Sequence, residues 1–388
     1  MNSQLPSLTL AQARQLALAA GAGFHRPNGR GPAAVADLVQ RLGFVQIDTI
    51  SVVERAHHHI VAARLPGYRT EWLSRAPVFE YWAHAAAYLP WSDFRHTLPR
   101  KERIRAHGHD WFHVEPAEAQ RVLDRIRSEG PLMARDFEAP RKTEGWWDWK
   151  PAKRALEYLF MAGDLMVLPR QGFQKVFDLT ERALPAGTDT RMPTPREHAV
   201  WYVDRALDVW GVVARDEFAY QRREHTDAVD EALRTGEESG TLTRVTVDGI
   251  SKTDYWVRTS DLERSEFPPA SRSLRILSPF DPFVIHRKRL RRLFGFDFTL
   301  ECYVPAPMRT FGYFALPLLW GDEFVGLLDA KADRAAGVLM VQNLRYDGPP
   351  KKQEKFRLAL DRALGEFAAF NGVVPPGPAP LDQFLPSR

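Results

Sequence analysis

Apolar residues recur every three or four positions in the first part of the chain, which predicts two amphipathic helices. The first covers residues 8–20, with Thr9 in the N-cap position, and the second covers residues 33–42 and is closed by a glycine. Residues 44–50 are rich in β-branched side chains and are typical of a short strand. Residues 51–54 then have the Ser-x-x-Glu spacing of a capping box, so we expect another helix to begin there.

The clearest segment, residues 116–185, has the order of elements that is typical of a winged helix. Three helices precede two strands that are joined by a turn containing glycine. In order, these are helices over 118–128, 133–138 and 151–162 and strands over 165–168 and 175–179. In this variant of the helix-turn-helix, the third helix enters the major groove of DNA.

The same order returns less regularly in residues 190–265, after a proline-containing linker at about 185–195. The expected elements are helices over 195–207, 215–221 and 226–235 and strands over 242–247 and 255–259. This part of the chain is therefore a second winged-helix candidate.

The last third changes character and predicts a β-rich domain over residues 270–373. It contains predicted strands over 311–320, 323–331 and 338–346 and a terminal helix over 351–370, followed by a proline-rich tail over 374–388. Together with an N-terminal helical region over residues 1–115, these segments predict an α+β fold of tandem winged-helix motifs with a β-rich C-terminal region.

The composition is that of a globular protein. Of the 388 residues, 44% are hydrophobic, and 53 lysines and arginines against 49 acidic residues give a net charge of +4, which permits a nucleic-acid partner without requiring one. The one cysteine, Cys302, excludes an internal disulfide and any multi-cysteine metal site. No apolar stretch is long enough to span a bilayer and no signal peptide is recognisable, so we expect a cytoplasmic protein without a membrane partner.

Residues 46–48 read Gln-Ile-Asp and bring an amide close to a carboxylate. Alternate residues of an extended segment share a face, so Gln46 and Asp48 point the same way. Such a pair could hold one water molecule, with Asp48 accepting its proton or stabilising a developing cation. The alternative is that Asp48 only caps the following helix, and the spacing by itself favours this simpler explanation.

Residues 57–59 are three consecutive histidines. They cannot converge on one ion from a helix, and on a strand only His57 and His59 share a face, so we predict no metal site and expect a cluster that faces solvent or DNA. Residues 80–84, Glu-Tyr-Trp-Ala-His, are interpreted as a core element with a hydrogen-bonded histidine.

Basic and aromatic side chains gather where a nucleic acid could bind. They lie before and on the third helix of the first winged-helix candidate, at its hairpin, and in a basic run near residue 289. The residues singled out are Trp149, Lys150, Lys153, Arg154, Arg170, Arg287 and Arg289. For the basic run a solvated helix face explains the pattern equally well. The sequence has no Walker loop, dinucleotide fingerprint, Gly-x-Ser-x-Gly elbow or His-Glu-x-x-His motif.

Six blocks of the sequence resemble the YcaQ/AlkZ family of winged-helix DNA glycosylases, and its YcaQ-like branch in particular. They are VQIDTI (45–50), EYWAH (80–84), WWDWKPAKRALEYLFMAGDLMV (146–167), LSPFDP (277–282), RLFGFDFTLECYVPAPMR (292–309) and GYFALPLL (312–319). With flanking segments the resemblance covers about residues 8–370. One departure is Ala85, since the family block continues with an acidic residue after the histidine.

The resemblance implies a monofunctional DNA glycosylase that needs no cofactor. Members of the family excise purines alkylated at N7, and the YcaQ-like branch also unhooks interstrand crosslinks. The signature of that branch, Gln-Φ-Asp, falls on Gln46 and Asp48, which the resemblance makes the catalytic pair. The expected partner is duplex DNA carrying alkylated or crosslinked purines, and we expect the protein to act as a monomer. A crosslinked base cannot be flipped fully, so we expect an open site that faces the groove.

Two other functions remain open at the level of sequence. A winged-helix transcription regulator would explain the helix and hairpin pattern, although regulators commonly dimerise on palindromic sites. A metal-dependent hydrolase built on the histidine cluster is the weakest alternative.

Overall fold

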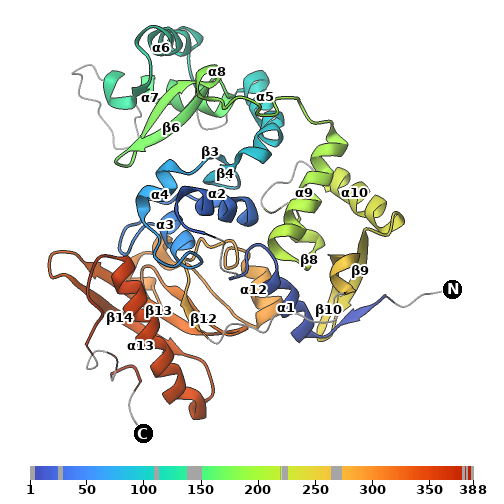
Figure 1. Cartoon of the computed structure of the whole chain (residues 1–388), viewed down its shortest axis with the longest axis vertical. Coiled ribbons are helices and arrows are strands. Elements are labelled where there is room, and N and C mark those ends of the chain that lie inside the picture. Colours follow the sequence, from blue (N-terminus) through green and yellow to red (C-terminus); the bar gives the residue numbers. More distant parts are fainter. Residues whose placement is uncertain are drawn as a thin grey trace.

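The computed structural model describes residues 5–24, 29–108, 113–137, 151–218, 220, 226–263, 273–377, 381 and 383–385. Within these residues, four small sheets are surrounded by helices, which confirms the expected mixed α+β class (Figure 1). None of the described helices is both long and apolar enough to cross a membrane.

The N-terminal part of the chain forms the centre of the molecule. Its elements are α1 (Leu10–Ala19), α2 (Gly31–Leu42), β2 (Val45–Gln46), α3 (Ala56–Ala62), α4 (Thr70–Arg75), β3 (Val78–Trp82), β4 (Ala86–Pro90), the 3₁₀ helix η1 (Trp91–Thr97) and α5 (Leu98–His107). The first helix begins as predicted, because Thr9 Oγ1 accepts from the Gln12 backbone N–H and the Gln12 side chain accepts from the Thr9 N–H. Strands β2, β4 and β3 form one sheet in that order.

The capping box expected at residues 51–54 is wrong. Helix α3 begins only at Ala56, and the backbone N–H of Glu54 donates instead to Oδ1 of Asn371 at 2.6 Å. Asn371 follows the last long helix of the chain, so the acceptor lies 317 residues away. A local sequence pattern cannot reveal a partner at that distance.

The elements predicted for residues 116–185 occur in the predicted order. They are α6 (Pro116–Glu129), β5 (Leu132–Met133), the 3₁₀ helix η2 (Ala134–Phe137), α7 (Pro151–Ala162), β6 (Leu165–Gln171), β7 (Gln174–Leu179) and α8 (Thr180–Ala183). Strands β5, β7 and β6 form a sheet, and α7 buries the apolar face expected from its spacing: Ala152, Ala155, Leu156, Leu159 and Phe160.

The segment over residues 190–265 also follows its prediction, with one addition from the N-terminus. It contains α9 (Pro195–Trp210), β8 (Val213–Ala214), the 3₁₀ helix η3 (Arg215–Glu217), α10 (Thr226–Glu238), β9 (Leu242–Val247), β10 (Ile250–Arg258) and α11 (Thr259–Leu262). Strand β1 (Ser7–Leu8) pairs in parallel with β9, so the start of the chain extends this sheet. Its two residues are too few to show a periodic pattern in the sequence.

The C-terminal part is a four-stranded sheet with a long helix. It comprises β11 (Leu274–Ile276), α12 (Arg287–Phe294), the 3₁₀ helices η5 (Glu301–Tyr303) and η6 (Ala306–Met308), β12 (Leu316–Trp320), β13 (Glu323–Asp333), β14 (Val338–Tyr346), η7 (Pro350–Lys352) and α13 (Gln353–Phe370). The hairpin around Gly321 is confirmed, with Trp320 opposite Glu323. Its first strand begins at Leu316 and not at residue 311, because residues 310–312 donate their backbone N–H groups to the carboxylate of Glu301.

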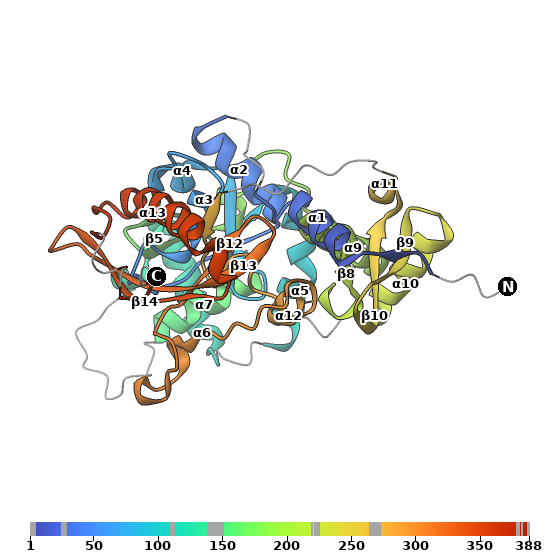
Figure 2. The same ribbon diagram turned by 90° about the horizontal axis from the view of Figure 1, so that it is seen from below.

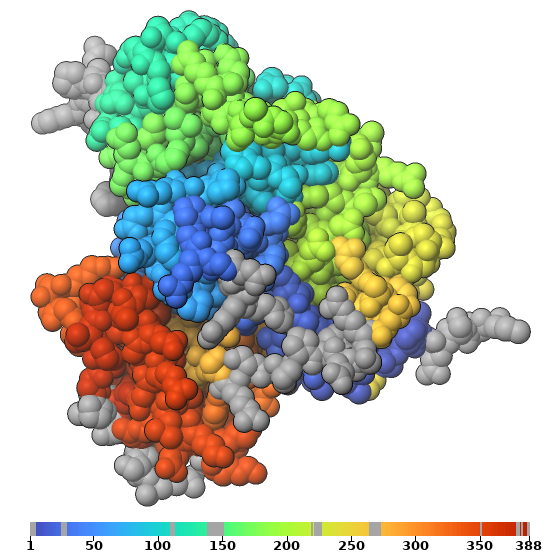
Figure 3. Space-filling model, in the orientation of Figure 1, coloured from blue at the N-terminus to red at the C-terminus, as the bar shows by residue number. Residues whose placement is uncertain are grey.

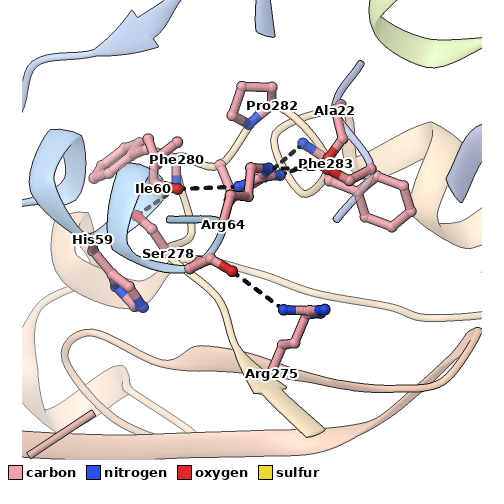
Figure 4. Close-up of polar contacts among 12 residues, drawn as sticks. Ala22, His59, Ile60, Arg64, Arg275, Ser278, Phe280, Pro282 and Phe283 are labelled. Carbon is pink, nitrogen blue, oxygen red and sulfur yellow. Dashed lines mark hydrogen bonds and ion pairs between the residues drawn. The ribbon is translucent and has the colours of Figure 1, made fainter. Parts of the chain in front are cut away.

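The central part contacts all the others. In Figure 1, α2, α3 and β3 lie between the α6–β6 segment, the α9–β10 segment and the C-terminal sheet, and Figure 3 shows these parts as one continuous surface. A buried ion pair holds the C-terminal part in place: the Arg64 guanidinium binds both carboxylate oxygens of Asp281 at 2.7 and 2.8 Å, with neither side chain exposed. Arg64 also donates to the carbonyls of Ala22 and Ile60 (Figure 4).

Candidate active site

The side chain of Gln46 is held by a histidine in the turn between β3 and β4. Its position at the end of β2 places it opposite Ala87 of β4, and the turn between β3 and β4 carries His84. The Nε2 atom of His84 lies 2.9 Å from Oε1 of Gln46, and Gln46 is buried. Since the carbonyl oxygen of an amide can only accept, His84 donates through Nε2, and the NH₂ group of Gln46 is left to donate to a ligand.

His84 was not foreseen as part of the site, although its block was recognised as a buried element. The interpretation of residues 80–84 as core is confirmed by β3, in which Glu80 and Tyr81 are buried. The His84 ring packs edge-on against Phe44 and Tyr220. The sequence signal that could have identified it is the block EYWAH, but the strand pairing that brings it to Gln46 is tertiary.

Asp48 lies two residues after the end of β2, beyond the last residue of that strand. Its Oδ2 atom accepts the backbone N–H of Ile50 at 2.9 Å. Burial raises the pKa of the Asp48 carboxyl above its usual range, against the opposing effect of backbone N–H groups of Ile50 and Thr49 and of the positive charge of Arg55. The alternative that Asp48 caps helix α3 finds no support, since α3 has no side-chain cap.

The C-terminal part of the chain also contributes to the surroundings of Asp48. The Ala332 N–H of β13 donates to the Val52 carbonyl at 2.8 Å, so the segment that follows Asp48 lies against the C-terminal sheet. After burial, the charge of Asp48 is the next largest cause of the raised pKa of Cys302. Burial and Cys302 raise the pKa of Tyr303 more than the charge of Asp48 does.

His84 also lines an aromatic cavity of about 280 Å³. Its lining residues include the aromatic side chains of Phe44, Trp82, Trp201 and Tyr220 and the basic side chains of Arg100 and Arg103. Neither Gln46 nor Asp48 is among its lining residues. His84 therefore contacts Gln46 and also lines the cavity, whereas neither Gln46 nor Asp48 lines it.

The three histidines lie on α3 in buried or half-buried positions. His57 is 3% and His59 is 2% exposed, and the latter donates through Nε2 to the carbonyl of Ile276 at 2.9 Å. Burial lowers the pKa of His59 to about 4, so the ring is neutral at pH 7. His58 bonds to the Tyr68 hydroxyl at 2.7 Å. The expectation of a cluster facing solvent or DNA is wrong for His57 and His59, because α3 packs them against other parts of the chain.

Arg170 is engaged by a carboxylate within the protein. It lies on β6, and its guanidinium forms two hydrogen bonds to Glu80 at 2.7 and 2.9 Å and a third to the Phe173 carbonyl. Glu80 is buried, and Lys175 lies 3.8 Å from it. The hairpin of β6 and β7 is thereby tied to β3, and Arg170 is better explained as a residue of this junction than as a DNA contact.

The basic run on α12 is also structural in part. Arg289 is 2% exposed and donates to Glu217 and to the carbonyls of Val212 and Trp210. Arg287 donates to the carbonyls of Val284 and Pro279. Both guanidinium groups donate hydrogen bonds to acceptors within the protein. The phosphate contacts expected for Arg287 and Arg289 are therefore not supported by their positions.

Two predicted DNA contacts remain at the surface of α7. Lys153 is exposed and Arg154 is half-buried, while Trp149 and Lys150 lie outside the described residues. In the described part of the chain, no three histidine, cysteine or acidic side chains are close enough to hold a metal ion.

Comparisons with known proteins extend these observations. A family model described as "DNA glycosylase AlkZ-like" matches residues 39–370, which is most of the chain. Among solved structures, the Streptomyces sahachiroi DNA glycosylase AlkZ matches with a TM-score of 0.60 at 19% sequence identity, over 95% of this chain and 98% of that chain. At this identity the structural likeness shows a common fold, and the family match shows kinship. The chain belongs to the AlkZ-like family of DNA glycosylases, hydrolases of N-glycosyl bonds.

Proposed function

We propose that this protein hydrolyses the N-glycosidic bond of N7-alkylated purines in duplex DNA, including purines in interstrand crosslinks, without a cofactor. The observation that carries the proposal is that His84 holds the amide of Gln46 and that the partly buried carboxylate of Asp48 follows two residues later. The sequence Gln-Ile-Asp is the Gln-Φ-Asp form that distinguishes the YcaQ-like branch, so we place the chain in that branch. The segments over residues 116–185 and 190–265 would act as winged-helix motifs on the duplex.

The chemistry needs only a few protein groups. A purine alkylated at N7 is cationic, so its glycosidic bond is already weakened and the base leaves without protonation by a strong acid. The sugar then develops positive charge, which the carboxylate of Asp48 stabilises electrostatically. A partly buried carboxylate acts strongly in this role because little water screens it.

The same two residues can deliver the water nucleophile. With its oxygen held by His84, the Gln46 amide presents its NH₂ group as a donor to the oxygen of a water molecule. Asp48 accepts a proton from that water as it attacks the sugar carbon. The products are the free base and an abasic site, with no covalent enzyme intermediate.

An open site is required for a base that is tethered to the opposite strand. Such a base cannot enter an enclosed pocket, whereas the glycosidic bond can still be approached from the groove. That Gln46 and Asp48 do not line the aromatic cavity supports this arrangement.

The decisive experiment measures base release from a duplex oligonucleotide with a single 7-methylguanine, detected by alkaline cleavage of the abasic product in the presence of EDTA. We expect release by the wild-type protein and loss of release by Asp48→Asn, with duplex binding retained. An Asp48→Asn protein that binds poorly but turns over normally would contradict the role of Asp48. Sequence-selective binding of undamaged palindromes with no release by either protein would favour a transcription regulator.

A further inference from the structure

Exposed apolar side chains are concentrated on one loop of the C-terminal part. Residues 301–313, the anchored loop, carry Tyr303, Met308 and Tyr313, which are 80%, 69% and 36% exposed. Eight large apolar side chains are exposed in the described part of the chain, so three within thirteen residues form a cluster. In Figure 2 the loop, in orange, projects from the body of the molecule.

The loop is rigid although it has no regular strand. The buried carboxylate of Glu301 accepts the backbone N–H groups of Thr310, Phe311 and Gly312 at 2.9–3.0 Å and the Thr310 hydroxyl at 2.5 Å. These hydrogen bonds, led by that of the Thr310 hydroxyl, lower the pKa of Glu301 to about 2. The two ends of the loop are thus joined through one charged side chain.

Further contacts fix the path between those ends. The Arg309 guanidinium donates to the Val304 carbonyl at 2.9 Å, and Asn343 of β14 donates to the Phe311 carbonyl at 2.9 Å. Prolines at 305 and 307 restrict the backbone where the loop turns. A Cβ atom at Gly312 would lie 1.9 Å from Oδ2 of Asp329, so only glycine allows this close approach.

The anchored loop and the segment that follows Asp48 contact the same strand. A Cβ atom at Gly312, near the end of the loop, would meet Asp329 of β13, and the Ala332 N–H of β13 donates to the Val52 carbonyl at 2.8 Å. At the start of the loop, burial and then the charge of Asp48 raise the pKa of Cys302. The loop that carries the exposed side chains is consequently joined through β13 to the segment that follows Asp48.

We propose that the anchored loop inserts Tyr303 and Met308 into the base stack of duplex DNA next to the damaged purine. This inference rests on the proposed function and names residues that would open the duplex at the proposed site. Apolar side chains that unstack base steps must be exposed before binding and held firmly, since a flexible loop would bend before the bases separate. An aromatic ring also offers a stacking partner to the base it displaces.

Insertion can be measured without catalysis. We would place 2-aminopurine, whose fluorescence rises on unstacking, beside a 7-methylguanine and add Asp48→Asn protein with and without Tyr303→Ala and Met308→Ala. The expected result is a rise in fluorescence that the two loop substitutions abolish at saturating protein. An equal rise with the intact and the substituted loop would overturn the proposal. Leu358→Ala is the matched control, because Leu358 is 67% exposed on α13, and it should leave the signal unchanged.

A second measurement links insertion to base release. In single-turnover assays the Tyr303→Ala/Met308→Ala protein should release 7-methylguanine about tenfold or more slowly than wild type from a fully paired duplex. The reduction in rate should be only about threefold or less when the flanking base pair is mismatched, because a mismatched pair costs less free energy to unstack. Tyr303→Phe, which keeps the ring, should retain most of the rate.

The outcomes separate this inference from the proposed function. If wild type releases the base but the loop substitutions slow paired and mismatched duplexes equally, the inference is wrong and the glycosylase remains. If wild type releases no base, the proposed function is wrong, and the 2-aminopurine signal still decides whether the loop inserts. A melting temperature unchanged by the substitutions would show that the fold is intact.

Discussion

In the proposed reaction, Asp48 combines a role that requires its charge with a position that disfavours that charge. Because burial raises its pKa in the folded protein, the folded state binds the proton more tightly than the unfolded chain does, and ionisation at neutral pH reduces stability. We therefore expect Asp48→Asn to raise the free energy of unfolding at pH 7 by up to about 1 kcal/mol while abolishing base release. Thermal unfolding at pH 7 and pH 4 checks this: the gain should diminish at the lower pH, where a larger fraction of wild-type Asp48 is protonated. A loss of stability at pH 7 would contradict the argument.

The same raised pKa sets an expectation for the pH dependence of the reaction. Asp48 must be ionised to stabilise the sugar cation, so base release should fall on acidification at a pH above the usual aspartate range of about 3.9. Single-turnover rates of release across pH 4–8, corrected for spontaneous loss of the base, measure this midpoint. A rate constant that stays level down to the ordinary range would argue against Asp48 as the group that titrates.

His84 is a positioning residue in this scheme, because it acts on Gln46 and not on the DNA. His84→Ala should lower the maximal rate of base release by about tenfold or more with little change in DNA affinity, and His84→Gln, which keeps a donor, should recover part of the rate. The double variant with Gln46→Ala should be no slower than Gln46→Ala alone. Additive losses would instead indicate that the two residues act independently.

At the scale of elements, the block LSPFDP serves the architecture and not the chemistry. The carboxylate of Asp281 accepts hydrogen bonds from both Nη atoms of Arg64 and from the backbone N–H of Phe283. Asp281→Ala would leave the buried guanidinium without its counter-charge and should destabilise the protein by about 3–5 kcal/mol. The control is Asp216→Ala, which breaks the more exposed pair with Arg292 and should change stability by about 1 kcal/mol or less. Denaturant unfolding of both variants tests this difference, and equal effects would contradict it.

The element predictions succeeded where the signal is local and failed where it is not. Helix α1 and helix α7 were predicted because their caps, glycines and apolar spacing lie within a few residues of each other. The predicted helix start at residues 51–54 and the predicted strand start at residue 311 were wrong. The backbone N–H of Glu54 donates to the Asn371 side chain, and that of Phe311 donates to the Glu301 carboxylate. Whether a distant side chain accepts a given backbone N–H depends on which segments of the chain lie together in the folded protein.

At the scale of the whole molecule, the proposed binding of duplex DNA leads to a prediction about its dependence on salt concentration. The net charge is only +4, and several of the arginines are neutralised by internal carboxylates, so affinity would depend on a limited number of phosphate contacts. Binding of Asp48→Asn protein to undamaged duplexes should weaken linearly in a plot of log affinity against log salt, with no preference among sequences. Titration by fluorescence anisotropy measures both, with random and palindromic duplexes as the comparison. A strong preference for one palindrome together with dimerisation would support regulation instead.

The sequence by itself determined the mixed class of the fold and most of the helices and strands, because each rests on spacing within a short window. Gln46 and Asp48 became the catalytic candidates through the resemblance of six sequence blocks to a known family, since their spacing alone favoured a helix cap. Only the tertiary structure decided that His84 holds Gln46, that the segment after Asp48 pairs with β13, and that Arg170, Arg289 and two of the three histidines face inward. The physical reason is that a charged or polar residue is read the same way in the sequence whether its partner is water, DNA or a buried carboxylate. Folding supplies that partner, often from hundreds of residues away.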